Sequence, residues 1–347
     1  MSLKETYNND NDDVIDVDVI DIELLDKEIK KKSNLCKKNS NNLLKKSSVL
    51  QEFTFFSENN INIQSKIKEI PFFTNYFHCF HEYCCIDNFN EINEVNIEKW
   101  DINKKYILIK YLKENKIYFN NYFHFLYNND NLKIYIKRLI ETYSYLLKSI
   151  IQLDNKKICY FYLNNENIYF NSRLEPIIEN FEKSIDFSSI TFDSICKIIE
   201  SFTIENFRFL PLEIFIIHYL NKYNIFSLSL SVIEDIYEEI NKTKIFNHFN
   251  ENIHEDLIHF LSPLINKTKV EIVKKLLKYI HTWDNYCLSL LYIEIIHKVI
   301  KELRYDTKYH FLSKWMLLLK KNISNNPSMR ETLKNTQEEY MTLLENI

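Results

Sequence analysis

The chain has 347 residues, no glycine, and 44 basic against 48 acidic side chains, which give a formal net charge of −4. Without glycine it cannot build a glycine-rich phosphate-binding loop such as the P-loop or G-x-G-x-x-G. The charge balance gives no general attraction to nucleic acid, and no stretch approaches 18 uninterrupted apolar residues. We therefore predict no nucleic-acid partner and no membrane partner.

Composition also sets the class of the protein. Hydrophobic residues make up 46% of the chain and aromatic residues 15%, which predicts a folded protein with a sizeable core. Ile, Asn, Lys, Phe and Tyr are abundant, as A+T-rich codons would produce, so an asparagine alone is weak evidence for a site. The seven cysteines form no regular framework, so we expect reduced thiols and a cytoplasmic protein.

Residues 1–48 form an acidic and then a basic segment. The acidic part alternates valine or isoleucine with aspartate, and Lys30, Lys31 and Lys32 begin a stretch rich in lysine, asparagine and serine. Low hydrophobicity and blocks of like charge predict disorder here. The alternating part could instead add an edge strand to a sheet or serve as a docking peptide.

The next region, residues 49–112, predicts a small sheet and one helix. Residues 61–70 place isoleucines at helical spacing and stop at Pro71, which indicates a short amphipathic helix. Residues 77–86 and 106–111 have the apolar, aromatic character of strands.

A cluster of zinc-type ligands lies inside the first of these strands. It consists of His78, Cys79, His81, Cys84 and Cys85. No second cluster stands at zinc-finger spacing, and the adjacent Cys84 and Cys85 would point to opposite faces of a strand. We therefore favour buried thiols and a surface histidine over a metal site.

Beyond residue 112 the pattern becomes mainly helical. Residues 131–153 carry apolar side chains at helical spacing and predict a long amphipathic helix. A strand, a polar loop (Asn164-Asn165-Glu166-Asn167) and a second strand follow at 158–170. Further helices are predicted at 190–201, 211–222, 229–240, 252–265, 269–281, 284–303, 309–322 and 330–345.

This order of elements resembles the large lobe of a protein kinase. The family's catalytic loop, H-R-D-L-x-x-x-N, falls on YFYLNNEN at residues 160–167. Leu163 and Asn167 match the family's pattern. Tyr162 stands at the position of the catalytic aspartate, and the histidine and arginine positions have changed as well.

Four more segments match the family in the correct order. Asn180-Phe181-Glu182 lies where D-F-G is expected, 13 residues after Asn167 (180 − 167). Pro211 and Glu213 resemble A-P-E. Asp284 in TWDNY resembles the aspartate that opens the family's central buried helix, and Arg330 resembles the arginine that pairs with the A-P-E glutamate.

The resemblance implies an α+β, protein-kinase-like bilobal fold. Residues 1–48 would be a disordered segment, 49–112 a degenerate N-terminal lobe, and 113–347 a mainly helical C-terminal lobe. Glu213 and Asp284 are 71 residues apart (284 − 213), more than in ordinary kinases. A helical insertion at about 223–280 is therefore implied, and it is a plausible place for a partner to bind.

LPLEI and this insertion are similar to divergent kinase-like proteins of large cytoplasmic DNA viruses, whose genomes are often A+T-rich. That resemblance implies a location in a host cytoplasm or a virion.

The implied catalytic site is degraded. Tyr162 has no carboxylate to accept a proton, and Asn180 supplies a neutral oxygen where a magnesium ion prefers a carboxylate. Glu179 or Glu182 could restore metal binding if either turned inward. Asn167 and Asn180 remain the candidate nucleotide contacts, and Asn167 could equally be only a turn residue.

In the N-terminal lobe, the position of the family's ATP-anchoring lysine falls on Gln51 or Glu52. The acidic residue that pairs with this lysine in the family could be Glu58 here or could be missing. No catalytic residue and no metal ligand is assigned. Glu213, Asp284 and Arg330 are expected to be structural.

Three hypotheses about function remain. The first is an inactive kinase-fold protein, a pseudokinase, that needs no cofactor and binds a protein partner or acts as a scaffold. The second is a divergent serine/threonine kinase that uses ATP and Mg²⁺. The third is a helical structural protein whose kinase resemblance is spurious. The sequence identifies neither the partner nor the oligomeric state.

Overall fold

The computed structural model describes residues 46–86, 104–112, 114–129, 132–243, 253–302 and 310–345. Most of the segment predicted to be disordered, 1–48, lies outside these residues. The chain divides into two compact units. The first contains the residues up to Glu58 together with Phe80–Glu114, and the second contains Asn59–Cys79 and the chain from Asn115 onward.

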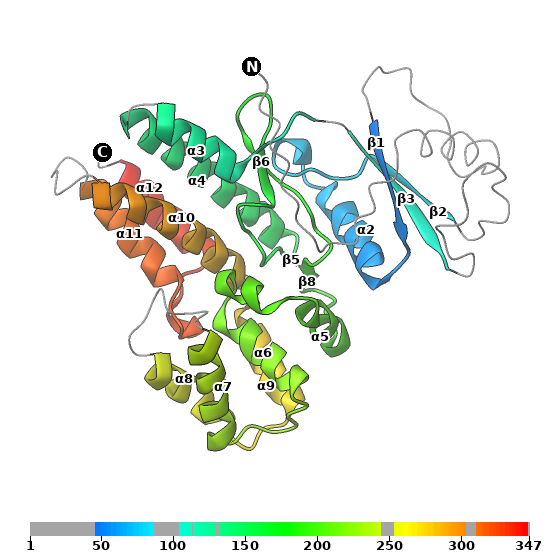
Figure 1. Ribbon diagram of the computed structural model, residues 1–347, viewed down its shortest axis with the longest axis vertical. Helices are drawn as coiled ribbons and strands as arrows, with labels where there is room; N and C mark the ends of the chain where they lie inside the picture. Colours follow the sequence, from blue (N-terminus) through cyan, green and yellow to red (C-terminus); the bar gives the residue numbers. More distant parts are fainter. Residues whose placement is uncertain are drawn as a thin grey trace. The chain divides into compact units, whose positions relative to one another are not determined.

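The first unit contains an antiparallel sheet of three strands (Figure 1). Its order is β1 (Lys46–Glu52), β3 (Tyr106–Leu112), β2 (Glu82–Ile86), so β3 is central. The first five residues of β3 are buried, as expected for an apolar strand covered on both faces. The strand predicted at 106–111 is therefore confirmed.

The strand predicted at 77–86 is wrong in its first half. Phe77 forms an isolated parallel bridge with Ile178, and the backbone N–H of His78 donates to the Ile178 carbonyl at 2.9 Å, both within the second unit. The backbone N–H of His81 donates to Lys110 in the first unit at 2.6 Å. The segment thus leaves one unit and enters the other, which prevents a single continuous strand.

Helix α2 (Phe55–Ile67) begins six residues before the predicted start. Its N-terminus is capped reciprocally, because the Thr54 N–H donates to Ser57 Oγ at 2.7 Å and the Ser57 N–H donates to Thr54 Oγ1 at 3.4 Å. A T-x-x-S cap is a weaker sequence signal than S/T-x-x-E, and for this reason the start was missed.

The core of the second unit is built by long helices. They are α3 (Phe119–Asn129), α4 (Leu132–Asn155), α10 (Trp283–Glu302), α11 (His310–Asn322) and α12 (Leu333–Leu344). Helix α4 confirms the predicted long amphipathic helix. The Tyr143 ring lies 4.9 Å from Tyr292, 5.1 Å from Trp315 and 4.7 Å from Tyr340, all edge to face. These contacts join α4, α10, α11 and α12.

Helix α3 was not predicted. Its buried residues Phe119, Tyr122, Phe123 and Leu126 follow helical spacing. Asparagine and aromatic residues have modest helix propensity, and tertiary packing decides the conformation instead. The Phe119, Tyr122 and Phe123 rings pack on Phe170 at 6.1, 3.9 and 6.1 Å between centroids.

The strand, loop and strand predicted at 158–170 exist, but they do not form a hairpin. β5 (Ile158–Cys159) pairs with β8 (Ile185–Asp186), while β6 (Ile168–Phe170) lies between β4 (Ile117–Tyr118) and β7 (Pro176–Ile178). The two strands therefore belong to different sheets, and loop 160–167 connects those sheets.

The remaining helices agree with the prediction to within a few residues. They are α5 (Phe192–Glu200), α6 (Leu212–Lys222), α7 (Leu230–Thr243), α8 (Ile253–Leu261) and α9 (Lys269–Leu276). Short 3₁₀ segments occur at Phe73–Asn75, Ile204–Phe209, Ser262–Leu264, Leu277–Thr282 and Pro327–Met329. The predicted insertion, 223–280, thus contains α7, α8 and α9.

Helix α12 begins at Leu333 and not at 330, because Thr332 caps it by accepting from the Asn335 N–H at 3.2 Å. None of the helices in the described ranges is both long and apolar enough to cross a bilayer.

The backbone adopts left-handed conformations without glycine. The residues are Phe72, Lys157, Phe161, Leu174, Asn180, Asn224 and Asn266, with φ between 41° and 64°. Asparagine tolerates this region well, whereas the other side chains are costly there.

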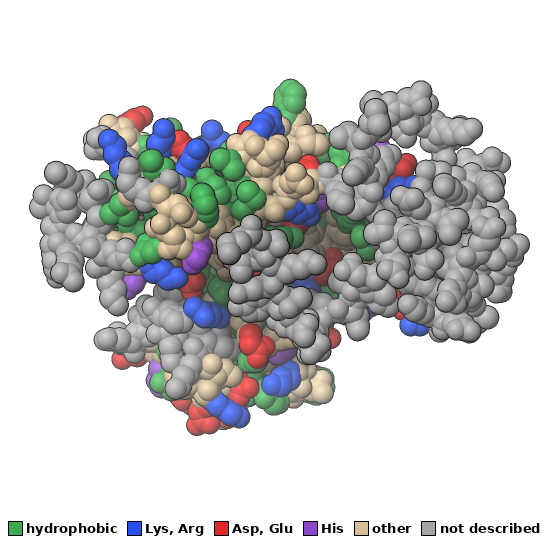
Figure 2. Space-filling model, turned by 45° about the horizontal axis from the view of Figure 1, so that its top comes forward, with side chains coloured by type: hydrophobic (Ala, Val, Ile, Leu, Met, Phe, Trp, Pro, Cys, Tyr) green, Lys and Arg blue, Asp and Glu red, His purple; other side chains and the backbone are tan. Residues whose placement is uncertain are grey.

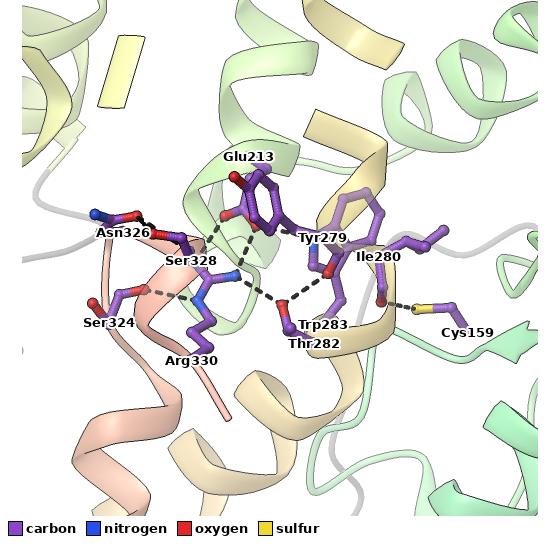
Figure 3. A network of polar contacts seen from close by, with 10 residues as sticks. All are labelled: Cys159, Glu213, Tyr279, Ile280, Thr282, Trp283, Ser324, Asn326, Ser328 and Arg330. Carbon is purple, nitrogen blue, oxygen red and sulfur yellow. Dashed lines mark hydrogen bonds and ion pairs between the residues drawn. The ribbon is translucent and has the colours of Figure 1, made fainter. Parts of the chain in front are cut away.

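A buried ion pair ties three parts of the second unit together (Figure 3). Arg330 donates from Nη1 and Nη2 to the two carboxylate oxygens of Glu213 at 2.7 and 2.8 Å, and neither side chain is exposed. Glu213 also accepts from Trp283 Nε1 at 3.1 Å, and Arg330 Nε donates to the Ser324 carbonyl at 2.7 Å. The two residues that the sequence suggested as partners are therefore in contact through a bidentate pair.

Replacement of Arg330 by methionine is expected to lower the free energy of unfolding by about 3–5 kcal/mol, because Glu213 would stay buried without its partner. The double variant Arg330→Met/Glu213→Gln removes the unpaired charge and keeps an acceptor for Trp283, so it should recover part of the loss. Urea unfolding measures both values. A double variant less stable than Arg330→Met would contradict the prediction.

Candidate functional site

Loop 160–167, which aligns with the kinase catalytic loop, is fixed by the carboxylate of Asp284. The Tyr160 N–H donates to Asp284 Oδ2 at 3.0 Å and the Phe161 N–H donates to Oδ1 at 2.5 Å. Phe161 has a φ of 41°. The carboxylate thus stabilises an unfavourable backbone conformation at the start of the loop.

Asp284 lies at the beginning of α10 and is only 3% exposed. Burial raises its pKa to about 7, while the two backbone donors and the nearby Cys159 thiol act in the opposite direction. Its two bonds to the backbone are those of a scaffold residue, since they hold the loop and leave neither oxygen without a donor.

Tyr162, at the position of the catalytic base, is engaged by the segment 202–206. Its hydroxyl accepts a hydrogen bond from Asn206 Nδ2 at 2.6 Å, and its ring lies 5.0 Å from that of Phe202. The ammonium group of Lys183 lies over both rings, 5.8 Å from Tyr162 and 4.8 Å from Phe202. Nothing in the sequence pattern marked Asn206 or Phe202 as partners of Tyr162.

Asn167 is held inside its own loop. Its Nδ2 donates to the Tyr162 carbonyl at 3.2 Å, and its own carbonyl accepts from the Glu179 N–H at 3.1 Å. The turn itself is made by Asn164, whose Oδ1 accepts from the N–H groups of Glu166 and Asn167 at 2.8 and 3.1 Å. Asn164 is a loop-forming residue that the sequence did not single out.

The segment that resembles D-F-G directly follows β7. Asn180 is exposed and left-handed, with a φ of 63°. Phe181 is fully buried and packs edge to face on Phe77 at 6.0 Å and on Tyr160 at 5.4 Å. Asn167 is thus bonded to the Glu179 backbone, next to Asn180, while Asp284 holds the start of the same loop.

Glu179 is held through both its side chain and its backbone. Its carboxylate forms an ion pair with Lys116, and its carbonyl accepts from the Tyr160 hydroxyl at 2.6 Å. Lys116 also lies over the ring of Tyr169, 4.8 Å from its centroid. Burial, and then the charge and hydrogen bond of Glu179, raise the pKa of Tyr118. Lys116 was not predicted from the sequence.

Glu182, the other candidate metal ligand, lies in a segment that α2 holds by its backbone. Asn59 Nδ2 donates to the carbonyls of Glu182 and Ser184 at 2.8 and 2.9 Å. Near the end of α2, Lys66 forms an ion pair with Asp186. These contacts fix the chain from 182 to 186.

In the first unit, the two positions suggested for the ATP-anchoring residue lie in strand β1. Glu52 pairs with Lys104 at 2.8 Å, and Gln51 stands opposite Ile107 in the β1–β3 register. Glu58 is exposed in the first turn of α2.

The histidines and cysteines of residues 78–85 do not meet as ligands. Tyr169 Oη lies 3.1 Å from His78 Nδ1, and burial raises the pKa of Cys79 to about 12. Across the described ranges, no three His, Cys, Asp or Glu side chains are grouped to hold a metal ion. The six cysteines there are free thiols.

No protein-family model matches the sequence, and no curated protein matches it either. Among solved structures, 456 chains match. One is described as the crystal structure of a Toxoplasma gondii specific rhoptry antigen kinase domain. It is similar over 86% of this chain and 74% of that chain, with a TM-score of 0.47 and 9% identity.

The arrangement within this chain has the contacts that the kinase resemblance implies. The Glu213–Arg330 pair is formed, and Asp284 holds the backbone of loop 160–167. The fold is protein-kinase-like. Small sheets with a helix precede a mainly helical region.

Replacement of Asp284 by asparagine is expected to cost about 2–3 kcal/mol of unfolding free energy. The amide would direct N–H groups at either Tyr160 or Phe161 and leave a buried donor unpaired. Hydrogen exchange at those two amides should accelerate. The exposed Asp235→Asn on α7 is the control and should change stability by less than about 0.5 kcal/mol. Equal effects of both substitutions would contradict this role.

His78 should make stability fall in acid. Burial, and then the charge of Lys116, lower its pKa to about 4. Between pH 6.5 and 4 the unfolded chain binds a proton that the folded chain does not, so stability decreases as the pH falls through this window.

His78→Gln should remove on the order of 2 kcal/mol of that decrease. The exposed His124→Gln is the control, and denaturant unfolding at several pH values gives the comparison. The same pH slope in wild type and His78→Gln would overturn the assignment.

Proposed function

We propose that this chain is a kinase-fold protein, a pseudokinase, that does not transfer phosphoryl groups and acts as a binding or scaffold module for a protein partner. The environment of Tyr162 carries this proposal. A catalytic base must accept the proton of the attacking hydroxyl. Tyr162 offers a phenol that already accepts from Asn206 and packs on Phe202.

The donor set around Asn180 supports the same conclusion. Magnesium ions at transferred phosphates are held by carboxylates. Asn180 carries a neutral amide, and the neighbouring carboxylate of Glu179 is neutralised by Lys116. These residues do not fit Mg-ATP. We propose no cofactor.

The two other hypotheses are less well supported. An active kinase using Glu179 would have to break the ion pair between Glu179 and Lys116. The Glu179 side chain is only 14% exposed in this pair. A kinase using Glu182 would have to bind metal from a segment whose backbone is already held by Asn59. The Glu213–Arg330 contact argues against a helical structural protein with a spurious resemblance, since such a protein has no reason to form it.

The class of partner and the location of the protein are proposed from the sequence. On the face drawn in Figure 2, Lys and Arg side chains are interspersed with Asp and Glu, as expected for a protein that does not bind nucleic acid broadly. We propose a location in a host cytoplasm or a virion, on the sequence resemblance to kinase-like proteins of large DNA viruses.

Nucleotide binding provides the test. Mg-ATP at about 5 mM should shift the thermal midpoint by less than about 1 °C, whereas a ligand at 100 times its Kd stabilises by about 2.7 kcal/mol and shifts it by several degrees. Isothermal calorimetry checks the same point. A shift of several degrees that requires Mg²⁺ and disappears in Glu179→Gln would favour the divergent active kinase.

A further inference from the structure

Within the predicted insertion, one exposed surface combines lysines with apolar side chains. We call it the α9 surface, and it consists of Phe226, Lys267, Val270, Lys274, Lys275 and Lys278. Phe226 is 80% exposed and Val270 42%. The Lys269 N–H donates to the Phe226 carbonyl at 2.8 Å, and Ser227 bridges Thr268, so the loop before α7 lies beside the start of α9.

Helix α9 explains why these side chains face outward. Its Ile272, Val273 and Leu276 are fully buried. Val270 and Lys274 stand at i and i+4, which places them on the opposite side of α9. Lys278 is exposed in the 3₁₀ segment that follows the helix. The outward side chains are thus a consequence of the helix register.

The α9 surface is strongly basic. It carries four lysines, and none of them forms an ion pair within the described part of the chain. The acidic residue of α9, Glu271, is used as a cap, because its carboxylate accepts from the Thr268 N–H and hydroxyl at 2.8 Å each. Lys267 and Lys269 stand at the positive end of the helix dipole, where cations are unfavourable. Lys274 and Lys275 lie in the last turn of α9, where the helix dipole favours cations. Local stability therefore accounts for part of this charge and gives no reason for Lys267.

The combination favours an acidic, aliphatic protein segment over a polyanion such as nucleic acid. The exposed Phe226 and Val270 require apolar partner atoms, which a phosphate backbone does not offer.

We propose that the α9 surface binds a partner protein through a segment in which acidic and aliphatic residues alternate. The proposal rests on the proposed function as a binding module and names the chemistry of the partner. Carboxylates would pair with Lys274, Lys275 and Lys278, while aliphatic side chains would cover Phe226 and Val270. Such a contact should weaken with added salt.

The test uses the full chain and a fluorescein-labelled peptide of about twelve residues in which Asp alternates with Val or Ile. Fluorescence anisotropy should show binding, and Lys274→Glu/Lys275→Glu should raise the Kd by at least about tenfold. Phe226→Ser should also raise the Kd. The control Lys314→Glu/Lys320→Glu changes the same net charge on the exposed face of α11 and should leave the Kd within about twofold.

The controls separate the possible outcomes. A peptide with Asn in place of Asp and one with Ser in place of the aliphatic residues should both bind more weakly. No binding at about 1 mM peptide, equal loss in the α11 control, or tighter binding of a single-stranded oligonucleotide of equal charge would overturn the proposal.

Circular dichroism and thermal unfolding establish that each variant is folded. If the peptide fails to bind and Mg-ATP still produces no thermal shift, the proposed role of the α9 surface is wrong. The proposed absence of catalysis is then unaffected.

Discussion

The N-terminal turn of α10 is the constraint on which the second unit depends. Asp284 accepts two backbone N–H groups of loop 160–167, and the preceding residue, Trp283, donates to Glu213, which is paired with Arg330. Buried charges survive only when their hydrogen-bonding capacity is satisfied. One turn of helix therefore contacts the loop and helix α6 and, through Glu213, the segment before α12.

This constraint does not involve the side chain at position 162. The contacts that hold the loop are made by backbone groups and scaffold side chains, so they do not depend on the residue at the base position. Asn206 and Phe202 accommodate the phenol of Tyr162. In the same way, Lys116 neutralises Glu179 beside Asn180. The positions where a nucleotide and metal would act are stabilised from within the chain.

Local periodicity was enough to predict α4 and β3, and ordered motifs were enough to suggest that Glu213 and Arg330 meet. The Lys116–Glu179 and Asn206–Tyr162 contacts could not be predicted, because they join residues 63 and 44 positions apart without a shared pattern. In a chain so rich in asparagine, Asn206 and Asn164 cannot be distinguished from background. Phe77 was misassigned because its pairing with Ile178 is a tertiary contact.

The left-handed backbone positions bear on how relatives of this chain can be found. In most proteins such a position is marked by glycine, and sequence profiles give that residue great weight. Here asparagine occupies it at 180, 224 and 266, and phenylalanine at 161. A sequence profile that scores residue identity does not recognise these positions in such a chain, because glycine is absent from them. A comparison of backbone angles still recognises them. Distant relatives of such glycine-poor chains should therefore be searched for by comparing backbone conformation before comparing sequence.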